Sequence, residues 1–464
     1  MADPSLRLDY ANLLSAHTSG GVAPQRLGGE LAERFRGAHA AVETRRASGD
    51  MGFFDLPYAA DTIARVKELA DGFGQWFHDV VVLGIGGSGL GALALRDALL
   101  GPYWNERTDE EREHFPRLHV VDNPDPETFR RLLHRLDPAK TLFNAVSKSG
   151  ATAETMAQYL VARAWVDEGV GEDHARGHFL FTTDPGRGAL RQIAEAEEIP
   201  ALPVPENVGG RFSVLSPVGL LPAAVCGVDV DELLAGAAAM EARCRTAELG
   251  ENPAGMLATL LHLADTEQRR PIHVLMPYVD RLRSFALWFQ QLWAESLGKA
   301  QGLDGRRAHT GPTPLAAVGA TDQHSMLQLF MEGPHDKVVL FVAVEDMGAD
   351  VAIPSRHPGI SSLGYLGGSS LGRLLDTERR ATAEALRREG RPNATVVLAR
   401  VDARALGEAL MLFQIATVYA GALYGVDPLD QPGVELGKIL TYGLMGREGY
   451  DVPELDPGDP RWVV

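Results

Sequence analysis

The chain has 464 residues, of which 45% are hydrophobic and 23% charged, a composition typical of a folded globular protein rather than a disordered one. Its formal net charge of −18 at pH 7 argues against a general binder of nucleic acid or of anionic membranes. The longest apolar run, residues 214–228, is broken by prolines and glycines and is shorter than the roughly 20 residues that a membrane helix needs.

Short apolar runs alternate with helical patterns along most of the chain. Such alternation is typical of βαβ units, in which parallel strands are joined by helices that cover the sheet. The predicted strands are residues 79–83, 118–121, 141–146, 178–182, 272–276, 337–342 and 395–399. The helices predicted among them are residues 90–100, 127–136, 153–166, 282–297 and 326–331.

The alternation occurs twice, so we predict an α/β protein with two domains, at residues 56–235 and 255–425. Residues 1–55 are polar and helical in pattern and predict an N-terminal helical extension. Residues 426–464 predict a C-terminal helical arm, with a helix that starts at Pro432.

The loop at residues 84–89 has the spacing G-x-G-x-x-G between a predicted strand and a predicted helix. In a dinucleotide-binding fold, an acidic residue follows about 20 positions later, at the end of the next strand. Here the acid at that strand end, Asp122, lies too far along the chain, and Asp109 falls in a charged helical run. We therefore do not expect a nicotinamide cofactor. The glycines indicate either close approach of the backbone to a ligand or a tight turn only.

A second loop, residues 147–155, reads Ser-Lys-Ser-Gly-Ala-Thr-Ala-Glu-Thr and lies between a predicted buried strand and a helix. The start of a helix offers free N–H groups and the positive end of the helix dipole. Four hydroxyls and Lys148 occupy this loop, and lysine is scarce here, at six of the 44 basic residues. A helix cap alone would explain one hydroxyl, so the loop favours a phosphate-binding site over a cap.

Glu295 lies in the last turn of the helix predicted at residues 282–297, close to Trp293 and Leu297. The negative end of the helix dipole and the apolar neighbours are both expected to disfavour its charged form. A carboxylate in such a place is suited to proton transfer. From these residues alone, a solvated glutamate at a helix end is an equally good interpretation.

Three other positions are weak signals when each is taken alone. Arg211 follows Gly209 and Gly210, a turn that can bring a guanidinium close to a ligand. His324 lies in a polar loop, and Lys438 is one of the six lysines, near the start of the last predicted helix.

A cytoplasmic location is expected from two further features. The N-terminal residues lack the basic start and apolar core of a secretory signal. The only cysteines, Cys226 and Cys244, cannot form a disulfide framework and do not have the spacing of a metal site.

Taken together, six segments resemble the glucose-6-phosphate isomerase (phosphoglucose isomerase) family, in the family's order and over roughly residues 80–440. They are GIGGSGLG (84–91), SKSGATAET (147–155), NVGGRFSVLSPVGLLP (207–222), FQQLWAESLGK (289–299), GATDQHSMLQLFMEGPHDK (319–337) and DQPGVELGK (430–438). The resemblance implies two sugar-isomerase (SIS) domains, each a three-layer α/β/α sandwich with a parallel sheet. It also implies a homodimer with shared active sites and no metal or redox cofactor.

The activity implied by the resemblance is the reversible conversion of D-glucose 6-phosphate to D-fructose 6-phosphate, a step of glycolysis and gluconeogenesis, by ring opening and a cis-enediol. Glu295 is expected to move a proton between C2 and C1, and Arg211 to stabilise the enediolate charge. Lys438 and His324, the latter reaching in from the partner subunit, are expected to assist ring opening. The residues expected to bind the phosphate or line the sugar are Gly87, Ser88, Ser147, Lys148, Ser149, Thr152, Glu154, Thr155, Gln291 and Gln431.

Two alternatives remain open at this stage. One is a relaxed isomerase that also accepts mannose 6-phosphate, because Gly150 and Ala151 replace the larger or hydroxylated residues that many family members have there. The other is an SIS protein that binds sugar phosphates without catalysis. Such a protein would need the 147–155 loop, but not Glu295, His324 and Lys438 together.

Overall fold

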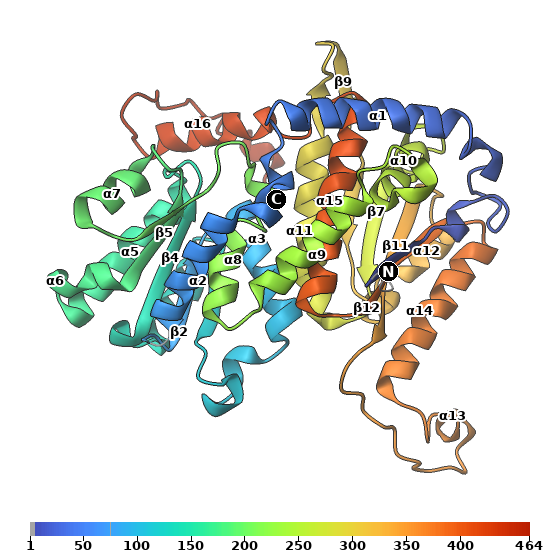
Figure 1. Ribbon diagram of the computed structural model, residues 1–464, viewed down its shortest axis with the longest axis horizontal. Helices are drawn as coiled ribbons and strands as arrows, with labels where there is room; N and C mark the ends of the chain where they lie inside the picture. The colour runs from blue at the N-terminus through green and yellow to red at the C-terminus, as the bar shows by residue number, and fades with distance from the viewer. Residues whose placement is uncertain (1–4, 75) are drawn as a thin grey trace.

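The computed structural model describes residues 5–74 and 76–464. The first four residues, on which the expectation of no secretory signal partly rests, lie outside this range. The described chain is built on two five-stranded sheets, which lie side by side in Figure 1 with a layer of helices between them.

The first sheet is entirely parallel and has the strand order β3-β2-β4-β5-β6. Its strands are β2 (Asp79–Leu83), β3 (Arg117–Val121), β4 (Thr141–Ser147), β5 (Phe179–Thr183) and β6 (Ala201–Pro203). The chain runs from β2 to β3 on one side and then crosses to β4 on the other, so the strand order reverses between β2 and β4. Ligands of open α/β sheets bind at the carboxyl ends of the strands at such a point.

Helices cover both faces of this sheet because its strands are apolar on both sides. The side chains of β2 alternate: Val81 and Leu83 pack into one hydrophobic cluster, and Val80 and Val82 into another. One face is covered by α4 (Pro126–Arg135), α5 (Ala153–Val170) and α7 (Ala189–Glu197), with the short α6 (Glu172–Ala175) after α5. The other is covered by α2 (Ala60–Gly74), α3 (Leu90–Leu95) and α8 (Pro217–Val225).

The second sheet has the order β1-β12-β11-β7-β10 and is parallel except at one edge. Its parallel strands are β7 (Ile272–Pro277), β10 (Thr313–Ala316), β11 (Lys337–Asp346) and β12 (Asn393–Arg400). The edge strand β1 (Leu6–Asp9) pairs antiparallel with β12. The outer face of this sheet packs against α12 (Leu327–Glu332) and α14 (Leu371–Arg388).

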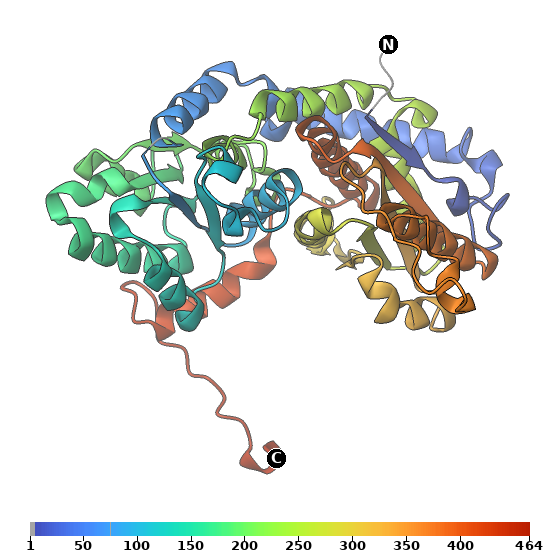
Figure 2. The same ribbon diagram turned by 90° about the horizontal axis from the view of Figure 1, so that it is seen from below.

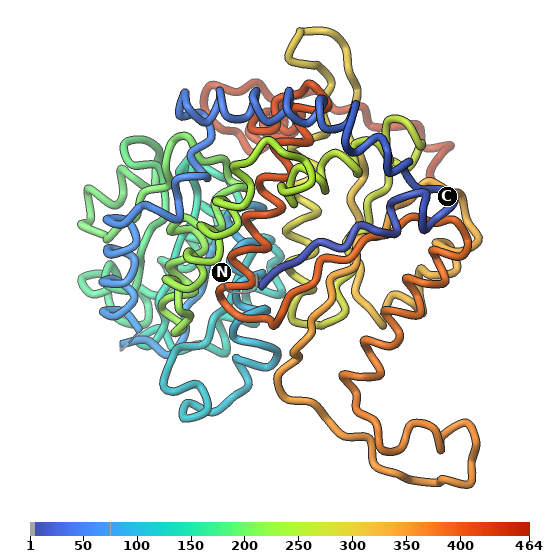
Figure 3. The backbone as a smooth tube through the Cα atoms, turned by 45° about the vertical axis from the view of Figure 1, so that its right-hand side comes forward, coloured from blue at the N-terminus to red at the C-terminus, as the bar shows by residue number. Residues whose placement is uncertain are grey.

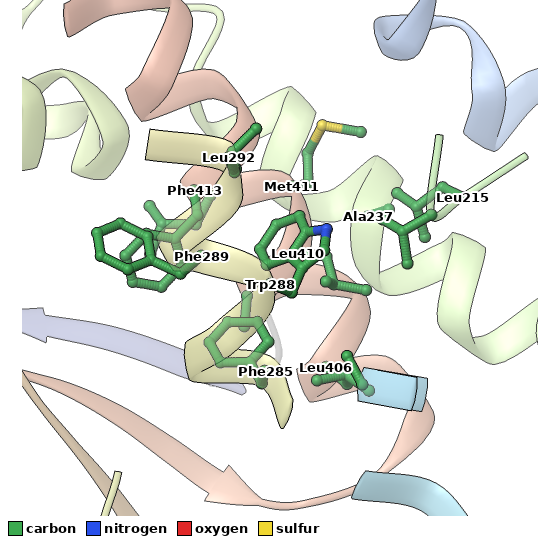
Figure 4. Close-up of a cluster of buried hydrophobic side chains, with 14 of the residues drawn as sticks. Leu215, Ala237, Phe285, Trp288, Phe289, Leu292, Leu406, Leu410, Met411 and Phe413 are labelled. Atoms are coloured by element: carbon green, nitrogen blue, oxygen red, sulfur yellow. The ribbon is translucent and has the colours of Figure 1, made fainter. Parts of the chain in front are cut away.

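The two sheets share one hydrophobic core in the layer between them. It is formed largely by α9 (Val230–Arg243), α10 (Pro253–Thr266), α11 (Arg283–Leu297) and α15 (Ala403–Tyr424). In Figure 4, Trp288 and Phe289 of α11 lie against Leu410 and Phe413 of α15. Because the core is continuous from one sheet to the other, it fixes the end of α11 relative to the loops of the first sheet.

Within the described residues, α15 is the one helix long and apolar enough to cross a membrane by length and composition. Its most apolar window is 89% buried inside the protein, between α9, α10 and α11. It is therefore accounted for as a core helix.

Three segments extend from this body. Helix α1 (Glu30–Ala47) lies across α15 and α10. A hairpin of β8 (Lys299–Gln301) and β9 (Arg307–Thr310) follows α11. Residues 347–370, which include α13 (Ser361–Gly364), project from the second sheet (Figure 3). Helix α16 (Glu435–Leu444) lies beside the first sheet, and the chain after it runs away from the body (Figure 2).

The predicted fold class, an α/β protein with parallel sheets, is confirmed, and each predicted strand starts within two residues of an observed strand. Two expectations need correction. The N-terminal extension is not purely helical, because β1 adds an edge strand to the second sheet. The helix expected at Pro432 begins as a 3₁₀ turn, Pro432–Val434, and becomes an α-helix at Glu435.

The crossing of α9 and α15 leads to a stability prediction. A Cβ on Gly407 would lie 1.9 Å from the carbonyl oxygen of Leu233, so the two helix backbones are in direct contact there. Gly407→Ala must push the helices apart, and we expect it to lower the free energy of unfolding by about 1–3 kcal/mol. Urea denaturation measures the change.

The matched control is Gly37→Ala in the exposed face of α1, where an added Cβ meets no atom within 4 Å. It should stabilise the protein by about 0.5–1 kcal/mol, because alanine is the better helix former. Wild-type stability of Gly407→Ala would contradict the helix contact.

Candidate active site

A pocket of about 700 Å³ opens at the carboxyl ends of β2 and β4, where the strand order of the first sheet reverses. Loops of the first sheet, the last turns of α11 and the segment leading into α16 all contribute to it. Its lining residues are Ile85, Gly86, Gly87, Ser88, Lys148, Ser149, Thr152, Asp184, Arg187, Gly210, Arg211, Gln291, Glu295, Gln431, Val434 and Lys438.

The glycine loop after β2 brings two other segments to the pocket. Gly86 has a φ of +57°, and a Cβ there would lie 3.0 Å from Nε2 of Gln291. A Cβ on Gly87 would lie 2.3 Å from the carbonyl oxygen of Gly210. The glycines therefore do more than form a tight turn, because they let the loop touch α11 and the turn that carries Arg211.

The loop after β4 gathers its hydroxyls ahead of helix α5. Ser147 Oγ lies 2.8 Å from Thr152 Oγ1 and 3.4 Å from Ser149 Oγ. Thr152 is the N-cap residue, but its side chain accepts no hydrogen bond from the first turn of the helix. The interpretation of the loop as a helix cap is therefore wrong, and the first-turn N–H groups of α5 keep their capacity to bind an anion.

The remaining candidates of this loop lie behind the pocket lining. Ser147 and Thr155 are buried, and Glu154 is half-buried. Thr155 Oγ1 has no hydrogen-bond partner among the described residues. Buried hydroxyls normally have a partner, so this oxygen retains the capacity to contact a bound ligand or a water molecule.

Lys148 fixes the loop to the chain that leads to Arg211. Its Nζ donates to the carbonyl oxygens of Glu206 (2.8 Å) and Val208 (2.9 Å). Burial lowers the pKa of Lys148, while Asp184 and Glu206 oppose that shift. The ammonium thus lies at the pocket with two of its donors already engaged by backbone.

Arg211 is buried and has partners from two other parts of the chain, the end of α11 and residues 428–431. Its Nε donates to Ser296 Oγ at 2.7 Å, and its terminal nitrogens donate to Gln431 Oε1 at 2.9 Å and to the carbonyl oxygens of Pro428 at 2.5 Å and Asp430 at 3.0 Å. Burial lowers the pKa of Arg211, and the nearby Glu295 opposes this. The result is a desolvated cation held rigidly at the floor of the pocket.

Glu295 projects from the last turn of α11 toward this guanidinium. Its Oε2 lies 3.8 Å from a terminal nitrogen of Arg211 and accepts a hydrogen bond from Gln291 Nε2 at 3.2 Å. Trp293 is buried elsewhere, where its indole N–H donates to Nδ1 of His273 at 3.1 Å. The neighbours of the carboxylate are therefore a cation and an amide, not the aromatic surface expected from the sequence.

The other two expected catalytic residues occupy different places. Lys438, on α16, lines the mouth of the pocket, is half-exposed and pairs with Glu435 at 2.7 Å. His324 ends the 3₁₀ turn Thr321–His324, is exposed and is not among the residues that line the pocket of its own chain.

Two charged lining residues were missed by the sequence reasoning. Asp184 accepts the backbone N–H groups of Gly186 and Arg187, both at 2.9 Å, and these bonds lower its pKa. Arg187 projects at the rim, 77% exposed. Both lie in the loop after β5, the neighbour of β4, so their position after a predicted parallel strand was the available signal.

The pocket of this α/β protein combines a helix start without a side-chain cap, hydroxyls around that start, and a carboxylate beside a buried guanidinium. Such a pocket suits the binding of a phosphorylated substrate and the transfer of a proton. The family model of phosphoglucose isomerase matches residues 65–448. The chain belongs to the phosphoglucose isomerase family.

Relatives and solved structures agree with this membership. The chain is 46% identical to a glucose-6-phosphate isomerase of Rubrobacter xylanophilus, over 97% of this chain and 100% of the relative. It is 41% identical to that of Carboxydothermus hydrogenoformans, over 99% and 100% of the two chains. A crystal structure of a hypothetical protein from Thermus thermophilus superposes with a TM-score of 0.84 at 39% identity, covering 95% of this chain and 100% of that one. A glucose-6-phosphate isomerase structure from Chlamydia trachomatis gives a TM-score of 0.72 at 26% identity, covering 83% and 73%.

The contact between the two glycine turns leads to a prediction. Gly87→Ala places a methyl group against the Gly210 carbonyl and must displace the turn that carries Arg211. We expect it to lower the free energy of unfolding by about 1–3 kcal/mol and to reduce isomerase activity. Gly210→Ala, whose Cβ meets no atom within 4 Å, is the stability control and should unfold at the wild-type urea concentration. Equal stability of the two variants would contradict the packing.

Proposed function

We propose that this protein catalyses the reversible isomerisation of D-glucose 6-phosphate and D-fructose 6-phosphate. The observation that carries the proposal is one pocket that contains the hydroxyl-rich start of α5 and, across from it, Glu295 at 3.8 Å from the buried Arg211. Membership of the family and the names of the relatives support the same activity. The reaction belongs to glycolysis and gluconeogenesis, and we place it in the cytoplasm.

In this proposal the phosphate group binds at the start of α5. Its charge is matched by the free first-turn N–H groups, the helix dipole and the nearby Lys148 ammonium. Hydroxyls of Ser149 and Thr152 donate to its oxygens, with Ser147 and Thr155 behind them. The sugar then extends toward α11, along Gly87, Ser88, Gln291 and Gln431. Glu154, half-buried in the first turn of α5, is a further proposed contact.

Glu295 is the proposed base. It takes the proton from C2 of the open-chain aldose, the C–H electron pair forms the C1–C2 double bond, and the π pair of the C1 carbonyl moves to O1, which gives the cis-enediol in its enediolate form. Return of the proton to C1, with transfer of the O2 hydroxyl proton to O1, forms the carbonyl at C2 and gives the ketose, so no atom is gained or lost. Arg211 stabilises the negative charge on the enediolate oxygen. Because its guanidinium is already desolvated and held in place, it needs little reorganisation during the reaction.

Ring opening requires a proton to move between the ring oxygen and the anomeric hydroxyl. Lys438 lies at the pocket mouth and is the proposed donor on this chain. His324 is exposed and outside its own pocket. We therefore propose a homodimer in which His324 of the partner subunit completes the site.

Purified protein supplied with fructose 6-phosphate should form glucose 6-phosphate, measured by coupling to a glucose-6-phosphate dehydrogenase. Absence of product would contradict the proposed function and leave a sugar-phosphate binder without catalysis. Parallel kinetics with mannose 6-phosphate decide the relaxed-isomerase alternative. Activity on that epimer within about tenfold of the glucose substrate would establish it.

Replacing the base should remove turnover and retain binding. Glu295→Gln keeps the shape of the side chain but cannot accept the C2 proton, so kcat should fall by about 10²–10⁴-fold with KM little changed. Glu168→Gln, on the exposed face of α5, is the matched control and should keep wild-type kcat. Wild-type turnover of Glu295→Gln would exclude Glu295 as the base.

Mixing two inactive variants tests the shared site. His324→Ala and Glu295→Gln are expected to be nearly inactive as pure proteins. After unfolding and refolding together, about half of the dimers are hybrids, and each hybrid has one site with both residues intact. Activity should therefore recover to about one quarter of wild type, measured in the coupled assay. No recovery, although hybrids form, would place His324 outside the partner's site.

A further inference from the structure

One of the six lysines, Lys299, is buried directly behind the pocket without lining it. It follows the end of α11, and its side chain is 5% exposed. Its Nζ donates to the carbonyl oxygen of Glu295 at 2.7 Å and to that of Asp430 at 2.9 Å, and lies 3.5 Å from the Asp430 carboxylate. Burying an ammonium costs free energy unless its N–H donors have acceptors. Here the acceptors are the backbone carbonyl of Glu295, the proposed base, and that of Asp430 in the segment that leads into α16.

The segment that Lys299 reaches, residues 428–431, has no regular secondary structure and is held largely by cations. The Asp430 carbonyl oxygen accepts from both Lys299 and Arg211, and Arg211 also binds the Pro428 carbonyl oxygen and the Gln431 side chain. Gln431 lines the pocket, and α16, which carries Lys438, begins four residues later. The placement of both side chains therefore depends on how this segment is attached to α11.

Arg211 and Lys299 do different work in this attachment. Arg211 connects the segment to the first sheet and to Ser296. Lys299 connects it to the backbone of Glu295, which otherwise would end α11 with an exposed carbonyl. Burial lowers the pKa of Lys299, and the neighbouring Arg211 adds to this shift. Arg211 and Lys299 thus share one acceptor, the carbonyl oxygen of Asp430.

We propose that Lys299 is a positioning residue that fixes the distance between the base Glu295 and the segment carrying Gln431 and Lys438. This rests on the proposed isomerase function. Lys299 touches no substrate in this account and acts through the two carbonyl oxygens. A displacement of about 1 Å at a reacting group can lower the rate by about 10²-fold. Loss of the hydrogen bonds made by Lys299 should therefore lower kcat.

Lys299→Met removes both hydrogen bonds and keeps a side chain of similar length. We expect kcat for fructose 6-phosphate to fall about 10–100-fold with KM within about threefold of wild type, because the phosphate loop lies on other elements. Lys337→Met is the matched control. Lys337 also begins a strand, is also nearly buried and binds Asp336, but it lies at the second sheet away from the pocket. It should keep wild-type kcat.

A double-mutant cycle with Gln431→Ala separates positioning from fold stability. If Lys299 acts through residues 428–431, the loss from Gln431→Ala should be at least about threefold smaller in the Lys299→Met background than in wild type. If the kcat of the double variant instead falls by the product of the two single losses, the residues act independently and the proposal is overturned. Equal losses of kcat in Lys299→Met and Lys337→Met would also overturn it.

If Lys299→Met does not fold, Lys299→Arg decides the question. Arginine keeps the charge and the donors, but its longer, planar group changes the spacing between the two carbonyls. A folded Lys299→Arg with kcat reduced at least about fivefold and unchanged KM supports the proposal, and wild-type kcat overturns it. An inactive wild-type protein would instead contradict the proposed function, so the two failures are distinguishable.

Discussion

The buried guanidinium of Arg211 is the interaction on which the arrangement of the pocket depends. It joins the turn after Gly210 to Ser296 at the end of α11 and to the segment at residues 428–431. A buried cation is stable only when its donors are satisfied, and leaving one buried donor without an acceptor costs about 1–3 kcal/mol, with larger costs for charged groups. Three segments that are distant in sequence are therefore held together by one side chain. Glu295 is the carboxylate close enough to offset its charge, at 3.8 Å.

The fold was largely readable from the sequence because its main strands are buried on both faces. Val80 to Leu83 form an uninterrupted apolar run, and such runs between helical patterns leave few alternatives to a parallel sheet. The short strands β1, β6 and β10 were not predicted. Each has three or four residues, too few for a periodicity to appear, and each gains its place by pairing with a longer strand already present.

The site was predictable in its residue types but not in its contacts. Gly87, Ser149, Thr152, Arg211 and Glu295 line one pocket, as do most of the other expected residues. Their physical roles depend on partners that the sequence does not reveal. Helix geometry suggested that Glu295 would face aromatic side chains, whereas a turn 84 residues earlier places Arg211 beside it. The scarcity of lysine was informative, since Lys148, Lys299 and Lys438 all lie at or directly behind the pocket.

Side-chain capping does not divide the two sheets, because α11 and α12, which follow β7 and β10, have no side-chain cap, but it does separate the helix starts at the pocket from several others. The helices α4, α14 and α15 follow β3, β11 and β12, and each is capped by a side chain of its own: Asp125, Ser370 and Asp402. At α14, Asp350 also accepts the N–H of Gly372, so a resident carboxylate already satisfies its first turn. The helices α3, α5 and α7 follow β2, β4 and β5 at the pocket, and within the described chain none has a side-chain cap. The first-turn N–H groups of a helix must bind some acceptor, and in α7 the N–H of Leu190 already donates to the carbonyl oxygen of Gly150 at 3.2 Å. The start of α5, whose neighbours Ser149 and Thr152 line the pocket, is therefore a helix start that an anionic substrate can complete.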